Sequence, residues 1–153
     1  MGEHFKTFGG AVLFLLREKD GAEQILLQKR RNTGYADGLW DVSVSGHVEA
    51  GEPLKAALIR EAAEELGIRV EYPDVAFATM THKATENGPT YYNVFFCVRR
   101  FAGEPQICEP EKCAEIRWFP LDALPETLLA DRRAALENFR AGVPYSEFGW
   151  PAG

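Results

Sequence analysis

The segment from Pro53 to Leu66 constrains the fold most, because its composition predicts a helix with both ends marked. Proline stands at the start, alanine and glutamate fill the interior, and Gly67 follows the end, as is usual at helix boundaries. With about 100° of turn per residue, the apolar side chains form one stripe: Leu54, Leu58, Ala62 and Leu66. A stripe of this kind packs against another element, so a layered fold is expected.

Two glutamates of this helix lie beside the apolar stripe rather than opposite it. On the same wheel Glu61 and Glu65 fall within about 20° of Leu54. They are one turn apart, and like charges at that spacing repel, more strongly when they are partly buried. A divalent cation such as Mg²⁺, which prefers hard oxygen ligands, relieves that repulsion. A solvated glutamate-rich face is the alternative, and the position beside the stripe favours the metal site.

The segment GHVEAGEPLKAALIREAAEELGI, from Gly46 to Ile68, resembles the Nudix box, G-x5-E-x7-R-E-U-x-E-E-x-G-U, where U is a bulky aliphatic residue. Its fixed positions are filled at the family's spacing by Gly46, Glu52, Arg60, Glu61, Glu64, Glu65, Gly67 and Ile68. Ala62 is a soft departure, at a position where the family often has Val, Leu or Ile. The later segment Trp118-Phe119-Pro120-Leu121 also looks like the family.

The resemblance implies a fold and a reaction. The implied fold class is α/β, more closely α+β, with a mixed β-sheet between α-helices and one Nudix domain over residues 1–153. The implied activity is metal-dependent hydrolysis of the pyrophosphate linkage in a nucleoside diphosphate joined to another group. Mg²⁺ is the expected cofactor, and Mn²⁺ is a substitute.

The resemblance also suggests metal ligands. Glu64 and Glu65 match metal ligands, Glu61 matches a ligand or the general base, and the Gly46 carbonyl is a further candidate. Some relatives place a base or an extra ligand in a later acidic loop. Such a loop surrounds Pro110 here, with Glu109, Glu111 and Glu115. Of these three we choose Glu111 as the metal ligand.

Four further residues complete the expected site. Arg60 matches a residue that orients a box glutamate by a charge-assisted hydrogen bond, and Glu52 matches the position that pairs with this arginine. Arg30 ends a predicted strand, where it can hold a phosphate by bidentate contact or be an ordinary basic strand end. Tyr35, in the loop that follows, can stack on a base, although loop aromatics also pack on their own domain.

The rest of the chain predicts strands around two helices. Strands are expected at Phe8–Leu16, Ile25–Lys29, around Gly46, within Ile68–Thr81 and Tyr91–Arg100, and at Ile116–Phe119. The turn Lys19-Asp20-Gly21 predicts a hairpin between the first two, the segment Arg30–Asp41 a loop, and Pro125–Phe139 a closing helix. Strands, helix, strands and helix in that order indicate an α/β or α+β sandwich.

Composition restricts the partners. The net charge is −6, and a protein that grips a nucleic-acid backbone is usually basic, so a small phosphorylated nucleotide is expected instead. The longest early apolar run, Ala11–Leu16, is too short for a membrane span. Three cysteines without a C-x-x-C pair suit a reducing cytoplasm. Association into a homodimer is left open.

Two other functions compete with the hydrolase. An enzyme similar to isopentenyl-diphosphate isomerase would need a cysteine near the box strand, where Ser43 and Ser45 stand instead. A non-catalytic Nudix-like binding module would typically have lost box glutamates, and none is lost here. Downstream signatures of the ADP-ribose and diadenosine-polyphosphate subgroups are absent, which leaves a nucleoside triphosphate or a modified nucleotide as the expected substrate.

Overall fold

The computed structural model of the chain describes residues 3–86 and 88–152. The strands are β1 (Phe8–Lys19), β2 (Ala22–Arg30), β3 (Trp40–Val42), β4 (Val44–His47), β5 (Ala76–Lys83), β6 (Tyr91–Val98), β7 (Cys113–Pro120) and β8 (Tyr145–Phe148). The helices are α1 (Leu54–Leu66), the short 3₁₀ helix η1 (Tyr72–Asp74) and α2 (Ala130–Arg140). No helix in this part of the chain is long and apolar enough to cross a membrane.

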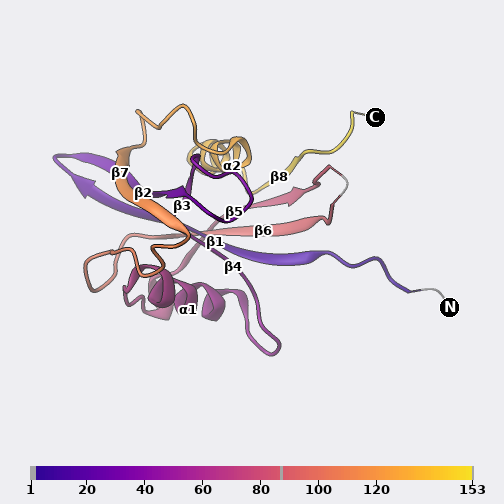
Figure 1. Cartoon of the computed structure of the whole chain (residues 1–153), viewed down its shortest axis with the longest axis horizontal. Coiled ribbons are helices and arrows are strands. Elements are labelled where there is room, and N and C mark those ends of the chain that lie inside the picture. Colours follow the sequence, from indigo (N-terminus) through magenta and orange to yellow (C-terminus); the bar gives the residue numbers. More distant parts are fainter. Residues whose placement is uncertain (1–2, 87, 153) are drawn as a thin grey trace.

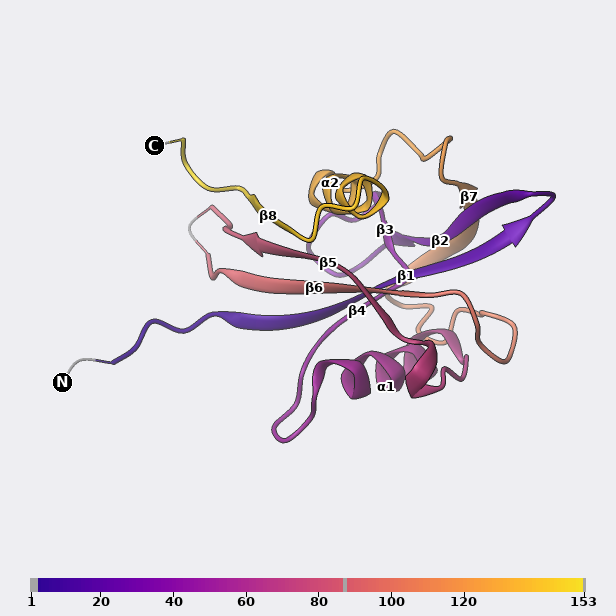
Figure 2. The ribbon, with the colours of Figure 1, turned by 180° about the vertical axis from the view of Figure 1, so that it is seen from behind.

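A mixed sheet lies between the two α-helices. Its hydrogen-bonded order, over the described residues, is β3-β2-β1-β6-β5-β8, with β4 paired to β1 and β7 paired to β2. Helix α1 covers one face and α2 covers the other (Figure 1, and from behind in Figure 2). Since β1 runs parallel to β6 and antiparallel to β4, the expected α+β sandwich is confirmed.

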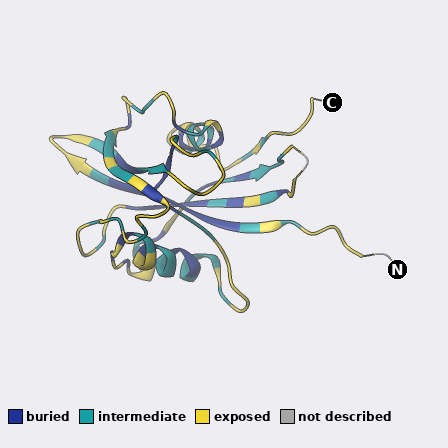
Figure 3. Ribbon diagram, in the orientation of Figure 1, coloured by how far each residue is buried: buried dark blue, intermediate teal, exposed yellow. Residues whose placement is uncertain are grey.

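Strand β1 supplies both apolar cores. Ala11, Leu13 and Leu15 pack toward α1, and the alternate side chains pack toward α2: Val12, Phe14 and Leu16. Successive strand residues point to opposite faces, so a continuous apolar run is what a strand covered on both faces requires. Figure 3 shows this buried centre where the strands cross between the helices.

The turn after β1 has the conformation that its residues predict. Asp20 and Gly21 both have positive φ, 53° and 80°, as a two-residue hairpin turn matched to the strand twist requires. The antiparallel pairing of β1 with β2 begins directly beyond it, at Lys19 opposite Ala22. The predicted hairpin is therefore confirmed.

Several boundaries differ from the sequence prediction, and β3 begins at Trp40, inside the predicted loop Arg30–Asp41, because Trp40 pairs with Lys29. The segment before α2 is not helical from Pro125, because its backbone pairs with Trp40, which donates to the Thr127 carbonyl and accepts from Leu129 N–H. The region after α1 contains η1 before β5 begins at Ala76. Strand β8, which pairs in parallel with β5, was not predicted, since its four residues are too short to show a period.

Candidate active site

Helix α1 has the predicted ends and the predicted stripe. Pro53 is its N-cap, and Gly67 ends it with φ of 67°, a left-handed conformation that suits glycine. The side chains that it buries against the sheet are Ala57, Leu58, Ala62 and Leu66. Glu61 beside this stripe is 18% exposed, whereas Glu64 is 57% exposed. The helix therefore turns one glutamate toward the protein and the other toward solvent.

Gly46 on β4 makes room for Glu61. A Cβ atom at this glycine would lie 2.7 Å from Glu61 Cδ and 2.8 Å from Oε1, closer than real contacts of this kind. The Glu61 carboxylate therefore lies directly on the β4 backbone. This contact explains why the helix and the strand of the box need a glycine at this position.

Arg60 gathers several carboxylates around one guanidinium. Its Nε and Nη2 donate to the two oxygens of Glu52 at 2.8 and 2.9 Å, and Nη1 donates to Glu61 Oε1 at 2.9 Å. Nη1 also lies 3.4 Å from Glu64 Oε2. This arginine, followed by the Glu49 N–H, lowers the pKa of Glu52 to about 2. The structure thus brings together the predicted pair Glu52–Arg60 and orients Glu61.

Glu65 is held in a different environment. Its carboxylate accepts a hydrogen bond from the Ser45 N–H, while Oε2 is buried and has no hydrogen-bond partner among the described residues. Burial first, and then the negative charges of Glu61 and Glu109, raise the pKa of Glu65 to about 8. A buried carboxylate oxygen without a donor is costly, and a cation is one partner that removes the cost.

The box residues therefore have the chemistry to bind a divalent metal, but in this structure they do not form a complete set of ligands around one point. Glu61, Glu65 and the Gly46 backbone meet where α1 crosses β4, and they offer the hard oxygens that Mg²⁺ prefers. Across the described part of the chain, no three Asp, Glu, His or Cys side chains surround a common point closely enough to form a metal centre. Arg60 binds Glu61 and Glu64 in this arrangement.

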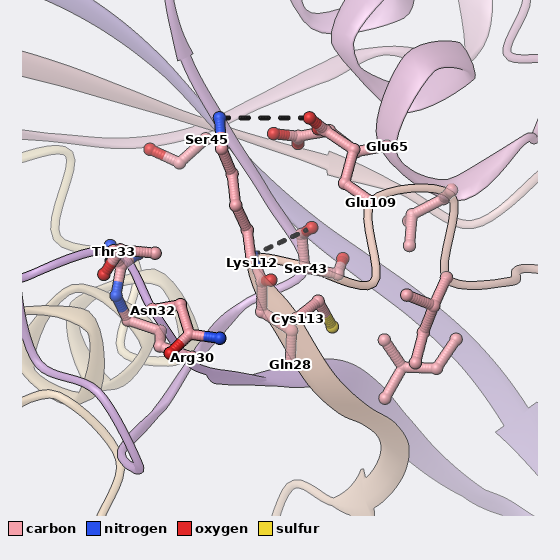
Figure 4. Close-up of a pocket in the computed structure, with 13 residues that line it drawn as sticks. Gln28, Arg30, Asn32, Thr33, Ser43, Ser45, Glu65, Glu109, Lys112 and Cys113 are labelled. Atoms are coloured by element: carbon pink, nitrogen blue, oxygen red, sulfur yellow. Dashed lines mark hydrogen bonds and ion pairs between the residues drawn. The ribbon is translucent and has the colours of Figure 1, made fainter.

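A pocket of about 420 Å³ opens beside Glu65, between β2, β7 and the loop before β7. Figure 4 shows Glu65, Glu109 and Lys112 around it, and the Lys112 Nζ lies 4.0 Å from Glu109 Oε2. Glu111, our choice from the sequence, is exposed and does not line this pocket. The N–H groups of Lys112 and Cys113 donate to the Glu109 carbonyl and form a turn. This turn places Glu109, and not Glu111, at the pocket.

Arg30 and Tyr35 are close together, and Arg30 forms hydrogen bonds within the loop that contains Tyr35. Arg30 donates to the Tyr35 carbonyl at 2.9 Å and to Asp41 Oδ2 at 3.0 Å, and its guanidinium lies 5.4 Å from the Tyr35 ring centre. A third nitrogen donates to Thr33. Arg30 lines the pocket beside Glu65, whereas Tyr35 lines a second pocket on the α2 side.

A buried ion network was missed by sequence reasoning. Asp41, 2% exposed, accepts Arg30 and Arg132 at 3.0 Å each. Asp131, also buried, accepts Lys83 at 3.0 Å. Asp41 stands between the apolar residues Trp40 and Val42 in the sequence, which indicates a buried carboxylate. Because buried charges need partners, that position could have predicted an ion pair.

Comparison with known proteins places this site in a family. A NUDIX domain model matches residues 7–139. The chain belongs to the NUDIX domain family. A crystal structure of a MutT NUDIX hydrolase from Burkholderia pseudomallei is 32% identical, with a TM-score of 0.73, over 86% of this chain and 97% of that one. The Nudix fold expected from the box is therefore confirmed.

Curated relatives of this Nudix domain have different activities. The NAD-capped RNA hydrolase NudC of Stutzerimonas stutzeri is 25% identical over 124 residues, which cover 80% of this chain and 40% of that protein. The isopentenyl-diphosphate Delta-isomerase 2 of Photorhabdus laumondii is 34% identical over 106 residues, 67% of this chain and 58% of that protein. The chain thus spans 40% to 58% of the length of these relatives.

Proposed function

We propose that the chain is a metal-dependent pyrophosphohydrolase that cleaves a nucleoside diphosphate linked to another group. A nucleoside triphosphate or a modified nucleotide is the substrate type. The observation that carries the proposal is Glu65, whose buried oxygen without a hydrogen-bond partner lies near Glu61 and Glu109. Arg60 compensates Glu61 and Lys112 lies beside Glu109, but Glu65 Oε2 has no partner among the described residues, and a bound cation would supply one.

The box residues have the chemistry to hold Mg²⁺ or Mn²⁺. Glu65, Glu61, Glu64 and the Gly46 carbonyl are the proposed ligands, with Glu109 in place of Glu111 as the acid from the later loop. A bound metal would neutralise phosphate oxygens and lower the pKa of a coordinated water.

The side chains around the metal ligands position a base. Arg60 donates to Glu61 Oε1, and no hydrogen bond to a described residue uses Oε2. Oε2 is therefore the atom that we propose accepts a proton from the attacking water. Glu52 holds one edge of the guanidinium, Nε and Nη2, through its two oxygens, so it acts on the reaction only by positioning Arg60.

The isomerase alternative has weaker support. It would place its chemistry on a cysteine near the box strand, but Ser43 and Ser45 occupy those positions. Cys113 lines the Glu65 pocket, where burial raises the pKa of its thiol. The three cysteines at 97, 108 and 113 are free, and we place the enzyme in the cytoplasm, where thiols stay reduced.

The test is a panel of nucleoside triphosphates, modified nucleotides and dinucleotides with Mg²⁺, with Mn²⁺ and with excess chelator. We expect phosphate or pyrophosphate release from at least one nucleotide, and its loss in chelator. Isopentenyl diphosphate serves as the comparison substrate. Turnover that persists in chelator, or isomerisation without nucleotide hydrolysis, contradicts the proposal. Metal-dependent binding without turnover of any substrate would indicate a binding module.

A further inference from the structure

The backbone of the loop before β7 is fixed to the end of α1. The Gln106 N–H donates to the Leu66 carbonyl at 3.0 Å, and the Cys108 N–H donates to the Glu65 carbonyl at 3.2 Å. Carbonyls in the last turn of a helix have no partner within the helix, and the loop supplies a donor for two of them. The position of the acidic turn that follows is therefore tied to that of Glu65.

The other side of the loop is fixed to the residue that follows β2. The Arg31 N–H donates to the Lys112 carbonyl at 3.0 Å, and the Arg31 guanidinium donates to the Pro110 carbonyl. The backbone of Lys112 therefore has a defined place beside the pocket. Its side chain is 64% exposed, so the flexible four-carbon stem alone decides where the ammonium lies.

The Lys112 ammonium lies beside a carboxylate of the pocket. Its Nζ is 4.0 Å from Glu109 Oε2, and Figure 4 shows the side chain extended across the pocket toward Glu109 and Glu65. Glu109 is 37% exposed, and an ion pair of this length and exposure contributes little to stability. The pair therefore breaks at little cost when either group gains a stronger partner.

Arg30, the other cation among the described residues that line this pocket, is fully engaged. Its three guanidinium nitrogens donate to the Tyr35 carbonyl, to Asp41 and to Thr33. Asp41 is 2% exposed, and taking one partner away from a buried carboxylate is strongly destabilising. Of the two lining cations, Lys112 is therefore the one that is able to change partners.

Metal binding would place Lys112 beside a like charge. Glu109 is a proposed metal ligand, and the ammonium already lies against it, so the metal and the lysine compete for one carboxylate. A nucleotide brings phosphate oxygens to the same pocket, and charge-assisted hydrogen bonds to phosphate are stronger than neutral ones. The flexible stem allows the ammonium to leave Glu109 for such an oxygen without any movement of the loop backbone.

We propose that Lys112 is an exchangeable counter-ion, which neutralises Glu109 in the metal-free protein and moves to a substrate phosphate when a metal takes Glu109. The proposal rests on the proposed function, because it takes Glu109 as a metal ligand. Lys112 then lowers the metal affinity of the free protein and raises the phosphate affinity of the metal-loaded protein. Metal binding and phosphate binding are thereby coupled through one side chain.

The first test measures Mn²⁺ binding without a nucleotide, so it needs no turnover. Lys112→Gln removes the charge and keeps a polar side chain. It should bind Mn²⁺ roughly threefold to tenfold more tightly than wild type, because a positive charge beside the ligand is lost. Lys112→Arg keeps the charge and should keep the wild-type affinity. The electron paramagnetic resonance signal of free Mn²⁺ gives the dissociation constants.

Lys19→Gln is the matched control. Lys19 is exposed and pairs with Ala22, at the opposite end of β2 from Arg30, so this variant removes the same charge at a distance from the pocket. It should bind Mn²⁺ as wild type does. An equal gain in Lys19→Gln and Lys112→Gln would reveal an effect of net charge alone and would overturn the proposal. An unchanged or weaker Mn²⁺ affinity in Lys112→Gln would overturn it as well.

The second test measures the phosphate side of the exchange. Imidodiphosphate, a pyrophosphate analogue that resists hydrolysis, is titrated by calorimetry in saturating Mg²⁺. Lys112→Gln should bind it roughly tenfold more weakly than wild type, because a hydrogen bond from a charged donor is lost, and Lys19→Gln should bind it equally well. Equal binding by Lys112→Gln would show that this lysine only opposes the metal, which contradicts the exchange.

The two tests separate this inference from the proposed function. If wild type hydrolyses a nucleotide with Mg²⁺ but Lys112→Gln has the wild-type Mn²⁺ affinity, only the role of Lys112 fails. If both affinities change as expected and no nucleotide is hydrolysed, the proposed function fails and the exchange at Glu109 stands. Absence of Mn²⁺ binding in both proteins overturns the two proposals together.

Discussion

Strand β4 separates two charge networks of opposite sign. On the α1 side one guanidinium, Arg60, lies within 4.0 Å of four carboxylates: Glu49, Glu52, Glu61 and Glu64. In the other network three cations surround two aspartates, and Lys83 and Arg132 line the pocket on the α2 side, whereas Arg30 lines the pocket beside Glu65. The acidic network has an excess of negative charge, and the other network has an excess of positive charge. The two sides of one short strand therefore differ in the sign of their excess charge.

The two networks also differ in burial. Glu49 and Glu64 are 70% and 57% exposed, and water screens such pairs, so their partners can change at little cost. Asp41 and Arg132 are almost fully buried, and removing one partner of a buried pair is strongly destabilising. We infer that the acidic side can rearrange around a metal and a phosphate, while the cationic side stays fixed.

Replacement of Glu65 should have the largest effect on activity. Glu65→Gln removes a proposed metal ligand and keeps the shape of the side chain, so activity should fall by roughly 10²–10³-fold. The metal-free protein should remain folded and gain stability at neutral pH, because glutamine needs neither the proton nor the buried charge that the Glu65 carboxyl needs in the folded state. Steady-state rates and melting curves in Mg²⁺ and in chelator measure both effects. Glu104→Gln, at an exposed loop position, is the control and should behave as wild type.

A rate within tenfold of wild type for Glu65→Gln would show that this carboxylate is not a metal ligand. The acidic network would then be a structural feature, and the contrast between the two sides of β4 would lose its functional meaning.

Gly46→Ala should cause the second-largest loss of activity. The added Cβ would lie 2.7 Å from Glu61 Cδ, so the carboxylate has to move by about 1 Å. Displacements of that size cost roughly 10² in rate. Gly9→Ala adds the same methyl group to the neighbouring strand in open space and should keep the activity. If the two variants have equal rates, the position of Glu61 against β4 does not matter for the reaction.

The local part of this site was predictable from the sequence. Glu61 and Glu65 lie on one helix, so helical periodicity alone placed them beside the apolar stripe, and both are partly buried in the structure. Glu52 is near in sequence, and the family resemblance supplied its pairing with Arg60, whereas the contact of Gly46 with Glu61 is seen only in the structure. Contacts within about twenty residues follow from local geometry.

The second pocket, on the α2 side, was not predictable in this way. Gly10, Lys83, Asn93 and Arg132 lie far apart in the sequence and meet only because β1, β6 and β5 are adjacent and α2 folds over them. Glu109 and Glu111 show a smaller form of the same limit. Two residues apart in an acidic loop, they are distinguished by the turn that the loop adopts, which composition does not determine.

Arg60→Gln tests whether the arginine of the acidic network positions Glu61 or binds the substrate. The variant loses the hydrogen bond to Glu61 and both bonds to Glu52, and the loss of a residue that orients a ligand typically costs ten- to a hundredfold. The loss should fall on kcat more than on KM, because Arg60 positions a group that acts in the transition state. Arg60→Lys should not restore activity, since lysine lacks the fork that holds Glu52. A rise in KM with kcat intact would place Arg60 on the substrate.

The last expected effect is on stability and not on activity: it is the pH dependence of stability in chelator. The pKa of Glu65 is about 8 in the folded protein and about 4.3 in an unfolded chain, so between these values the folded state holds a proton that the unfolded state has lost. The free energy of unfolding should therefore fall as the pH rises through this window, by roughly 3 kcal/mol between pH 5 and pH 8. Glu52, whose lowered pKa acts in the opposite direction below pH 4.5, is common to wild type and Glu65→Gln. Denaturant unfolding of both proteins at pH 5 and pH 8 isolates the effect of Glu65. If the free energy of unfolding changes equally in wild type and in Glu65→Gln, this carboxylate is ionised in the folded protein throughout the range.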